Sequence, residues 1–162
     1  GDLIWQFNYG TDTADEEGLA ICDTGDCVLV AGLQRATGGT PDIYVVRIDN
    51  DGGAVWSNTY GAAGQDEAHD VIRASNGEYV IVGTAPSAGG ADRDMYLLRI
   101  DGTGGVVYER RFGGDGDDQA FGVEETSEGG FLIAGTTFSF GNDTREAAYL
   151  VKTDVEGNVS SP

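Results

Sequence analysis

The 162-residue sequence has little of what catalytic and nucleic-acid-binding proteins need. It contains one histidine, one methionine, two cysteines, three prolines and nine basic residues, of which only Lys152 is a lysine. Proteins that bind nucleic acids or anionic membrane surfaces carry patches of basic residues. A formal charge of −19 therefore argues against both partners. No apolar run approaches the roughly 18 residues that span a bilayer, so membrane insertion is not expected.

Recognisable catalytic motifs are missing as well. The sequence has no Gly-x-Ser-x-Gly elbow, no phosphate-binding loop and no histidine cluster for a transition metal. His69 is the lone histidine, and its counterparts in the repeat described below are Gly18 and Phe121, so it is interpreted as a residue of a strand surface. The sequence therefore predicts a protein that is not an enzyme.

Acidic residues are what the sequence has in excess. There are 28 of them, 18 being aspartate. Carboxylates hold water and cations tightly, and a dense acidic surface almost without lysine suits a protein that stays soluble in concentrated salt. This composition favours a halophilic source, with an ordinary acidic secreted protein as the alternative.

A threefold internal repeat dominates the chain. The segment from Tyr96 to Asp101 recurs from Tyr44 to Asp49 and from Tyr149 to Asp154. Aromatic-glycine pairs at positions 9–10, 60–61 and 112–113 set the periods at 51 and 52 residues. Repeats of this length indicate one domain over 1–162, divided at about 1–52, 53–104 and 105–157.

Each repeat offers four strands, which in the middle copy are residues 54–60, 68–74, 78–83 and 95–101. The second and third are joined by Asn76-Gly77, whose positive backbone angles suit a hairpin turn. Residues 79–82 and 95–98 are apolar without alternation, which predicts burial of both faces. We therefore expect an all-β fold with β-propeller-type blades, built from three four-stranded antiparallel meander repeats.

The repeat resembles a known family in the following positions of its middle copy: Trp56, Tyr60-Gly61, Asp66, Val71, Gly77, Tyr79 to Thr84, Asp94, Tyr96 to Asp101 and Gly104. This pattern is similar to the SBBP-type repeats of secreted bacterial and archaeal β-propeller proteins. The resemblance covers essentially the whole chain and implies a propeller on an exported or surface-attached protein, with no general catalytic set. The third copy departs from it at Ala147, where Asp42 and Asp94 stand in the other copies.

The first and last strands of the frame do not have partners in their own repeats. A strand over residues 3–9, with Leu3, Trp5, Phe7 and Tyr9, precedes the first repeat's other strands, and the third repeat lacks the matching strand after Asp154. Propellers have about four to eight blades, more than three. We expect the 3–9 strand to complete the last blade in cis or in trans, and favour strand addition to another chain. The alternatives are a piece of a longer propeller and a closed three-bladed monomer.

Two cysteines and two sequons indicate an oxidising location. Cys22 and Cys27 flank a short turn at positions that correspond to Arg73 and Glu78, as directly facing hairpin residues would, so a Cys22–Cys27 disulfide is predicted. Asn142 and Asn158 begin Asn-x-Thr and Asn-x-Ser triplets, which are candidate glycosylation sites. Together they predict an extracellular or cell-surface protein.

The sequence predicts that no cofactor is required. Calcium is the one cofactor that the sequence offers as an alternative. Glycine-rich turns carry carboxylates that a hard cation accepts, namely Asp49, Asp51, Asp115, Asp117 and Asp118. Asp15, Asp66 and Asp118 also recur once per repeat, which favours a structural role in which the carboxylate accepts backbone N–H groups. The alternative is a carboxylate pair for glycoside chemistry, at Asp66-Glu67 or Asp117-Asp118.

These observations predict a non-catalytic extracellular module that assembles with itself through blade edges, as a cell-surface or filament subunit. The alternatives are a propeller that binds or cleaves a glycan, and part of a larger surface propeller protein. Self-association is the favoured partnership, with a glycan as the second candidate.

Overall fold

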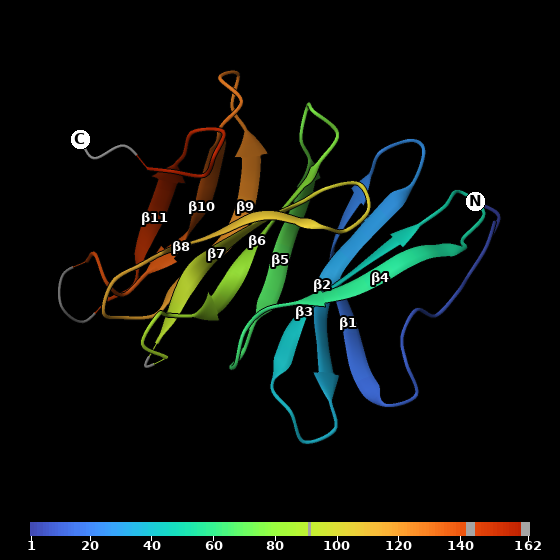
Figure 1. Cartoon of the computed structure of the whole chain (residues 1–162), viewed down its shortest axis with the longest axis horizontal. Coiled ribbons are helices and arrows are strands. Elements are labelled where there is room, and N and C mark those ends of the chain that lie inside the picture. The colour runs from blue at the N-terminus through green and yellow to red at the C-terminus, as the bar shows by residue number, and fades with distance from the viewer. Residues whose placement is uncertain (91, 142–144, 160–162) are drawn as a thin grey trace.

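A computed structural model describes residues 1–90, 92–141 and 145–159 (Figure 1). The described residues form eleven strands and no helix, and so no helix that could cross a membrane. The strands are β1 (Ala14–Asp23), β2 (Val28–Ala36), β3 (Pro41–Ile48), β4 (Ala54–Tyr60), β5 (Glu67–Arg73), β6 (Tyr79–Pro86), β7 (Arg93–Ile100), β8 (Val106–Phe112), β9 (Asp118–Glu125), β10 (Phe131–Thr137) and β11 (Ala147–Lys152).

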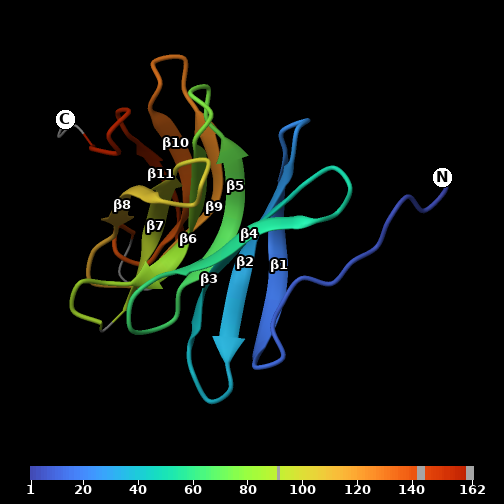
Figure 2. The ribbon, with the colours of Figure 1, turned by 45° about the vertical axis from the view of Figure 1, so that its right-hand side comes forward.

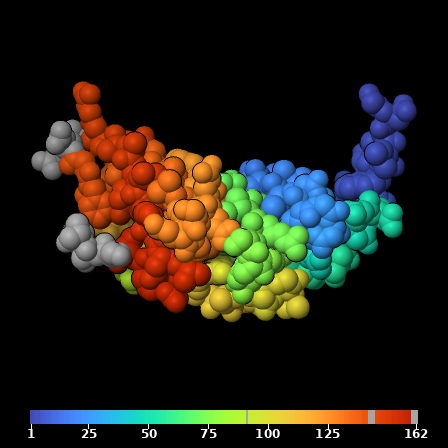
Figure 3. Space-filling model, turned by 90° about the horizontal axis from the view of Figure 1, so that it is seen from above, coloured from blue at the N-terminus to red at the C-terminus, as the bar shows by residue number. Residues whose placement is uncertain are grey.

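The strands form three antiparallel meander sheets, as predicted, which we call the first, second and third blades. Their orders are β1-β2-β3-β4, β5-β6-β7-β8 and β9-β10-β11. The blades lie side by side (Figures 1 and 2), and seen from above they form a shallow crescent (Figure 3). The third blade differs from the expectation of four strands, because β11 has no outer partner among the described residues.

Aspartates end the third strand of every blade and close the turn that follows. The Oδ1 atom of Asp49 accepts the Gly53 N–H at 2.7 Å, and the same atom of Asp101 accepts the Gly105 N–H at 2.9 Å. The residue before each of these glycines, Gly52 or Gly104, has φ of +85°, which an L side chain rarely adopts. The Asp-then-glycine ending of the repeat is thus the sequence of a tight turn.

Apolar side chains fill the two junctions between blades. Val45 of the first blade packs with Tyr96 and Leu98 of the second, and Leu97 of the second packs with Ile133 of the third. The central strands β6 and β7 contribute to both clusters, which explains their continuous apolar runs. Burial between blades, at about 25 cal/mol per Å² of apolar surface, is therefore what holds the stack together.

One glycine per blade permits a close approach between the first and second strands. A Cβ added at Gly32, Gly83 or Gly135 would lie 1.8 to 1.9 Å from a carbonyl oxygen of the neighbouring strand. A β-bulge interrupts the pairing next to each of these glycines. This explains why the strand-ending glycine recurs at a fixed distance in the sequence.

Candidate functional site at the blade edges

Residues 1–11 form an arm that belongs to no strand, although a strand was predicted over residues 3–9. The arm leaves the first blade at the end of the crescent (Figures 2 and 3). Its apolar side chains face solvent, with Leu3 77%, Ile4 91% and Phe7 55% exposed. Exposed apolar segments are typical of interaction sites, so the arm is a candidate for one.

The aromatic residues of the arm lie over the β3–β4 turn. The Phe7 and Trp5 rings face Gly52, where an added Cβ would lie 2.4 Å from Phe7 Cε2 and 3.2 Å from Trp5 Cδ2. The Tyr9 hydroxyl donates to the Gly52 carbonyl oxygen at 2.8 Å. Tyr9 also packs against the buried side chains of Tyr44, Val46 and Ile48.

Side chains of an outer strand also lie over the matching glycine at both junctions inside the stack, and the hydroxyl contact of Tyr9 is repeated by Tyr60. Trp56, Asn58 and Tyr60 of β4 lie over Gly104 in the next blade, and the Tyr60 hydroxyl donates to the Gly104 carbonyl oxygen at 2.9 Å. Tyr108 and Arg110 of β8 likewise lie over Gly157, and Tyr108 donates to the Val155 carbonyl oxygen at 3.1 Å. The arm therefore occupies on the first blade the place that an outer strand of a preceding blade would take.

The open edge of β11 is the complementary feature at the other end. A hollow of about 480 Å³ runs along β11, lined by Tyr149, Leu150, Val151 and Lys152 together with residues 111–113 and Val159. Leu150 is 63% exposed, whereas its repeat equivalents Val45 and Leu97 are 0% exposed. Among the described residues, this edge and face therefore lack the cover that the other two blades have.

The outward face of the first blade is uncovered along β1. Ile21 pairs with Val30 and is 69% exposed, whereas Val71, which pairs with Ile81 at the matching place in the second blade, is only 3% exposed. The two ends of the stack thus present the two halves of a blade junction.

A carboxylate secures the entry to each blade, and it is buried in the second and third blades. Asp66 and Asp118 are 0% exposed and accept the N–H groups of Ala62 and Gly114 at 3.3 and 3.0 Å, which confirms the predicted structural contact. In the first blade Glu16, not Asp15, makes this contact, accepting the Thr11 N–H at 3.0 Å. The prediction for Asp15 is wrong because the β1–β2 register differs by one residue from that of β5–β6.

A second aspartate faces the buried one across a junction. A Cβ added at Gly113 would lie 2.1 Å from Asp94 Oδ1 and 2.5 Å from Asp118 Oδ2, so both carboxylates point at the same place. Burial, followed by the negative charges of Asp92 and Asp118, raises the pKa of Asp94. Burial also raises the pKa of Asp66 to about 6, with a smaller contribution from Asp42 across the other junction. These pairs favour a neutral acid between blades.

The two cysteines are free thiols, which corrects the predicted disulfide. Cys22 pairs with Leu29, so Cys27 lies diagonally two residues along the partner strand and does not face it. The buried Cys27 Sγ instead lies 3.2 Å from Arg47 Nε and 3.3 Å from the Tyr79 hydroxyl. Burial opposes ionisation of Cys27, but these hydrogen bonds and that of Thr24 outweigh it and lower its pKa.

The five aspartates weighed for calcium fall into two separate turns. Asp49 accepts amides of its own hairpin, including that of Asp51, and Asp117 accepts the Arg93 N–H at 3.0 Å. Asp118 is buried as described above, and Asp115 is exposed. Within the described ranges no three His, Cys, Asp or Glu residues come together as a metal site.

The structure describes one of the two sequon asparagines, and it describes the histidine. Asn142 is outside the described residues, whereas Asn158 is exposed and its Nδ2 donates to Asp154 Oδ2 at 3.1 Å. His69 lies in the β5 bulge, stacks on Phe121 with 5.3 Å between ring centroids, and its Nδ1 is 2.7 Å from the Ala120 carbonyl oxygen. The His69 side chain therefore bridges the second and third blades.

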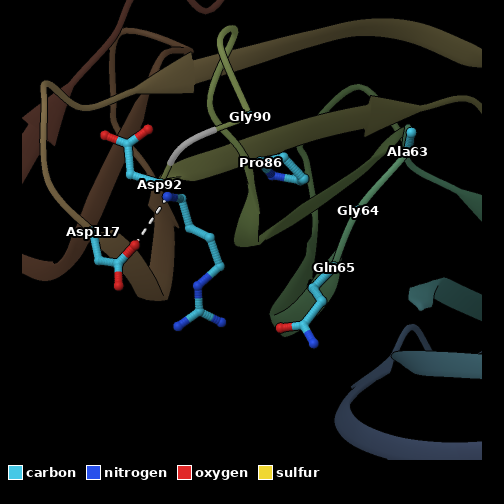
Figure 4. A pocket seen from close by; sticks show the side chains of 8 residues that line it. Ala63, Gly64, Gln65, Pro86, Gly90, Asp92 and Asp117 are labelled. Atoms are coloured by element: carbon cyan, nitrogen blue, oxygen red, sulfur yellow. Dashed lines mark hydrogen bonds between the residues drawn. The ribbon is translucent and has the colours of Figure 1, made fainter.

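A polar hollow of about 320 Å³ opens between loops of the second and third blades (Figure 4). Asp92 and Asp117 lie on one side of it and Gln65 on the other, and Asp117 accepts the Arg93 N–H on its own side. This is the place to which the glycan-binding alternative applies.

Comparison with known proteins does not identify the chain. No family model matches it, and no curated protein matches it.

Proposed function

We propose that the protein is a non-catalytic structural module that assembles with copies of itself through its blade edges. The observation that carries the proposal is the arm, which makes on the first blade the contact that β4 and β8 make on the second and third. A segment held as an outer strand, with no sheet to join among the described residues, is suited to strand addition at the β11 edge, which the described residues leave open.

We further propose that the module works outside the cell, on a surface or in a filament, and belongs with the SBBP-type repeats. The pattern of Trp56, Tyr60-Gly61, Asp66 and the Tyr96 to Asp101 strand supports this proposal. The free cysteines remove one argument for an oxidising location, and the exposed Asn158 sequon keeps another.

The native mass of the 162-residue chain tests self-assembly. We expect light scattering after size exclusion to give a multiple of the 16.9 kDa chain mass, and deletion of residues 1–9 to give a folded monomer. A matched control replaces residues 87–90, an exposed loop of the second blade, by a Gly-Ser linker and should leave the mass unchanged. A wild-type chain that stays monomeric at high concentration would contradict the proposal.

A further inference from the structure

The internal pairing of β4 and β8 fixes how an arm would lie on β11. In the first blade Tyr44 pairs with Thr59 and Arg47 with Trp56, and in the second Tyr96 pairs with Arg111 and Arg99 with Tyr108. The repeat equivalents in the third blade are Tyr149 and Lys152, and those in the arm are Asn8 and Trp5.

We infer, on the basis of the proposed function, that β11 binds the arm of a second copy with Asn8 opposite Tyr149 and Trp5 opposite Lys152, and that two copies exchange arms reciprocally. This pairing puts Phe7 opposite Leu150. Both side chains are exposed in the single chain, and their internal counterparts, Asn58 opposite Val45, lie at a filled junction.

The arm brings its own blade with it. Because Phe7 and Tyr9 are already held on the β3–β4 turn of their own chain, an arm bound to β11 puts the uncovered face of its first blade against the uncovered face of the neighbour's third blade. Ile21 and Leu150 then become covered as Val71 and Leu97 are inside the stack. Holding the arm beforehand also lowers the ordering cost of binding.

The junction between two copies has one carboxylate where the junctions inside the stack have two. Inside the stack, Asp42 and Asp94 begin the third strands and face Asp66 and Asp118 of the next blade. At the junction between copies the corresponding residues are Ala147 and Glu16, so a single carboxylate is buried in place of two. Two separate molecules therefore meet without the repulsion that the covalent chain overcomes internally.

The number of blades favours a closed dimer over larger assemblies. Each copy of this 162-residue chain contributes the three described blades, and a junction that repeats the internal geometry adds one blade step each time. Closed propellers contain about four to eight blades, and among multiples of three only six falls in that range. Two copies with two identical junctions give six blades, a closed arrangement with twofold symmetry.

Cysteine cross-linking tests both the register and the closure. In a Cys22→Ser/Cys27→Ser background whose native mass equals that of the wild type, Asn8→Cys with Tyr149→Cys should oxidise to a covalent dimer, with more than half of the chains linked. The matched control, Asn8→Cys with Lys152→Cys, shifts the second cysteine by three residues, or about 10 Å along the strand and to its other face, and should stay unlinked.

The outcomes separate this inference from the proposed function. A dimer band on a non-reducing gel, without higher species, supports the reciprocal pair. A ladder of multimers, or stronger linking in the Lys152 control, overturns the closed pair or the register while self-assembly stands. A wild-type chain that is monomeric by mass overturns both.

Discussion

At the residue scale, Asp66 makes folding depend on pH in an unusual direction. Its folded pKa is raised to about 6, above its usual value, so the folded chain binds this proton more tightly than the unfolded chain does. Its stabilising contribution is complete below the usual pKa and is lost as the pH rises through about 6. A neutral replacement is therefore expected to stabilise the protein only where Asp66 is ionised.

We predict that Asp66→Asn raises the free energy of unfolding by about 1 to 3 kcal/mol at pH 7.5 and leaves it almost unchanged at pH 4. The asparagine oxygen can still accept the Ala62 N–H, so the turn should remain. Urea unfolding at the two pH values measures the difference. A loss of stability at pH 7.5 would show that the charged form of Asp66 is the one that the fold requires.

Asp101 is the matched control, with the opposite sign. Hydrogen bonds from the Thr103 hydroxyl and from the Gly105 and Thr103 amides lower its pKa. Its contribution is present above the usual pKa and is lost as the pH falls. We expect Asp101→Asn to destabilise the protein at pH 7.5 and to have less effect at low pH, in the same urea titrations.

At the element scale, the close approach at the β5–β6 bulge predicts a large effect of one methyl group. Ala at Gly83 would put its Cβ 1.9 Å from the Glu67 carbonyl oxygen, so the strands must separate. We expect Gly83→Ala to lower the free energy of unfolding by about 3 kcal/mol or more. Gly89→Ala, with no atom within 4 Å of the added Cβ, should change it by less than about 0.5 kcal/mol. Equal effects in thermal or urea unfolding would contradict the observed strand spacing.

The positions of the strands were predictable from the sequence, because their apolar runs and Asp-Gly endings repeat three times. The one-residue difference between the β1–β2 and β5–β6 registers was not, because the two repeats have the same spacing from aromatic-glycine pair to second strand. That difference moves the carboxylate role from Asp15 to Glu16. It also moves Cys22 one residue further from Cys27, although in the second blade Arg73 already pairs with Tyr79 and not with Glu78. Local pattern specifies a strand, whereas the pairing partner and any bulge specify its register.

The sequence pattern of the arm is that of a strand, which is why a strand was predicted over residues 3–9. Among the described residues, the arm lacks the backbone pairing that a strand needs. Trp5, Phe7 and Tyr9 alternate as in β4, but no neighbour in the described chain accepts and donates their backbone hydrogen bonds. What the sequence did not reveal is the contact of the arm with Gly52. The repeated Tyr9, Tyr60 and Gly52, Gly104 positions were the signal for it.

The arm contact predicts that Tyr9 acts on assembly and Tyr60 on folding. Tyr9→Phe removes the hydrogen bond to the Gly52 carbonyl oxygen and frees the arm, so we expect weaker self-association, by about fivefold for a bond worth about 1 kcal/mol, with unchanged thermal stability of the diluted monomer. Tyr60→Phe removes the equivalent bond to Gly104 inside the stack and should lower stability by about 1 kcal/mol. Sedimentation equilibrium and urea unfolding distinguish the two. If the two variants behave identically in both measurements, the proposal that the arm acts as the outer strand of a neighbouring copy is contradicted.

At the scale of the whole molecule, the formal charge of −19 opposes both folding and association. Only a few carboxylates are paired in the described residues, among them Glu78, which Arg99 contacts at 2.5 Å, and Glu128, which Lys152 contacts at 2.9 Å. The remaining carboxylates repel one another over a distance that the ionic strength sets. Two copies brought together in a six-bladed pair double the charge and increase that repulsion.

We therefore predict that salt stabilises the fold and strengthens assembly together. Raising sodium chloride from about 0.1 to about 1 M shortens the Debye length from about 10 to about 3 Å, which removes most of the repulsion between separated carboxylates. The melting temperature and the association constant should both rise. A variant in which the exposed residues Asp115, Glu124 and Glu146 are replaced by their amides should need less salt for the same melting temperature. A chain whose melting temperature and native mass are the same at both salt concentrations would show that the acidic surface is not a halophilic adaptation.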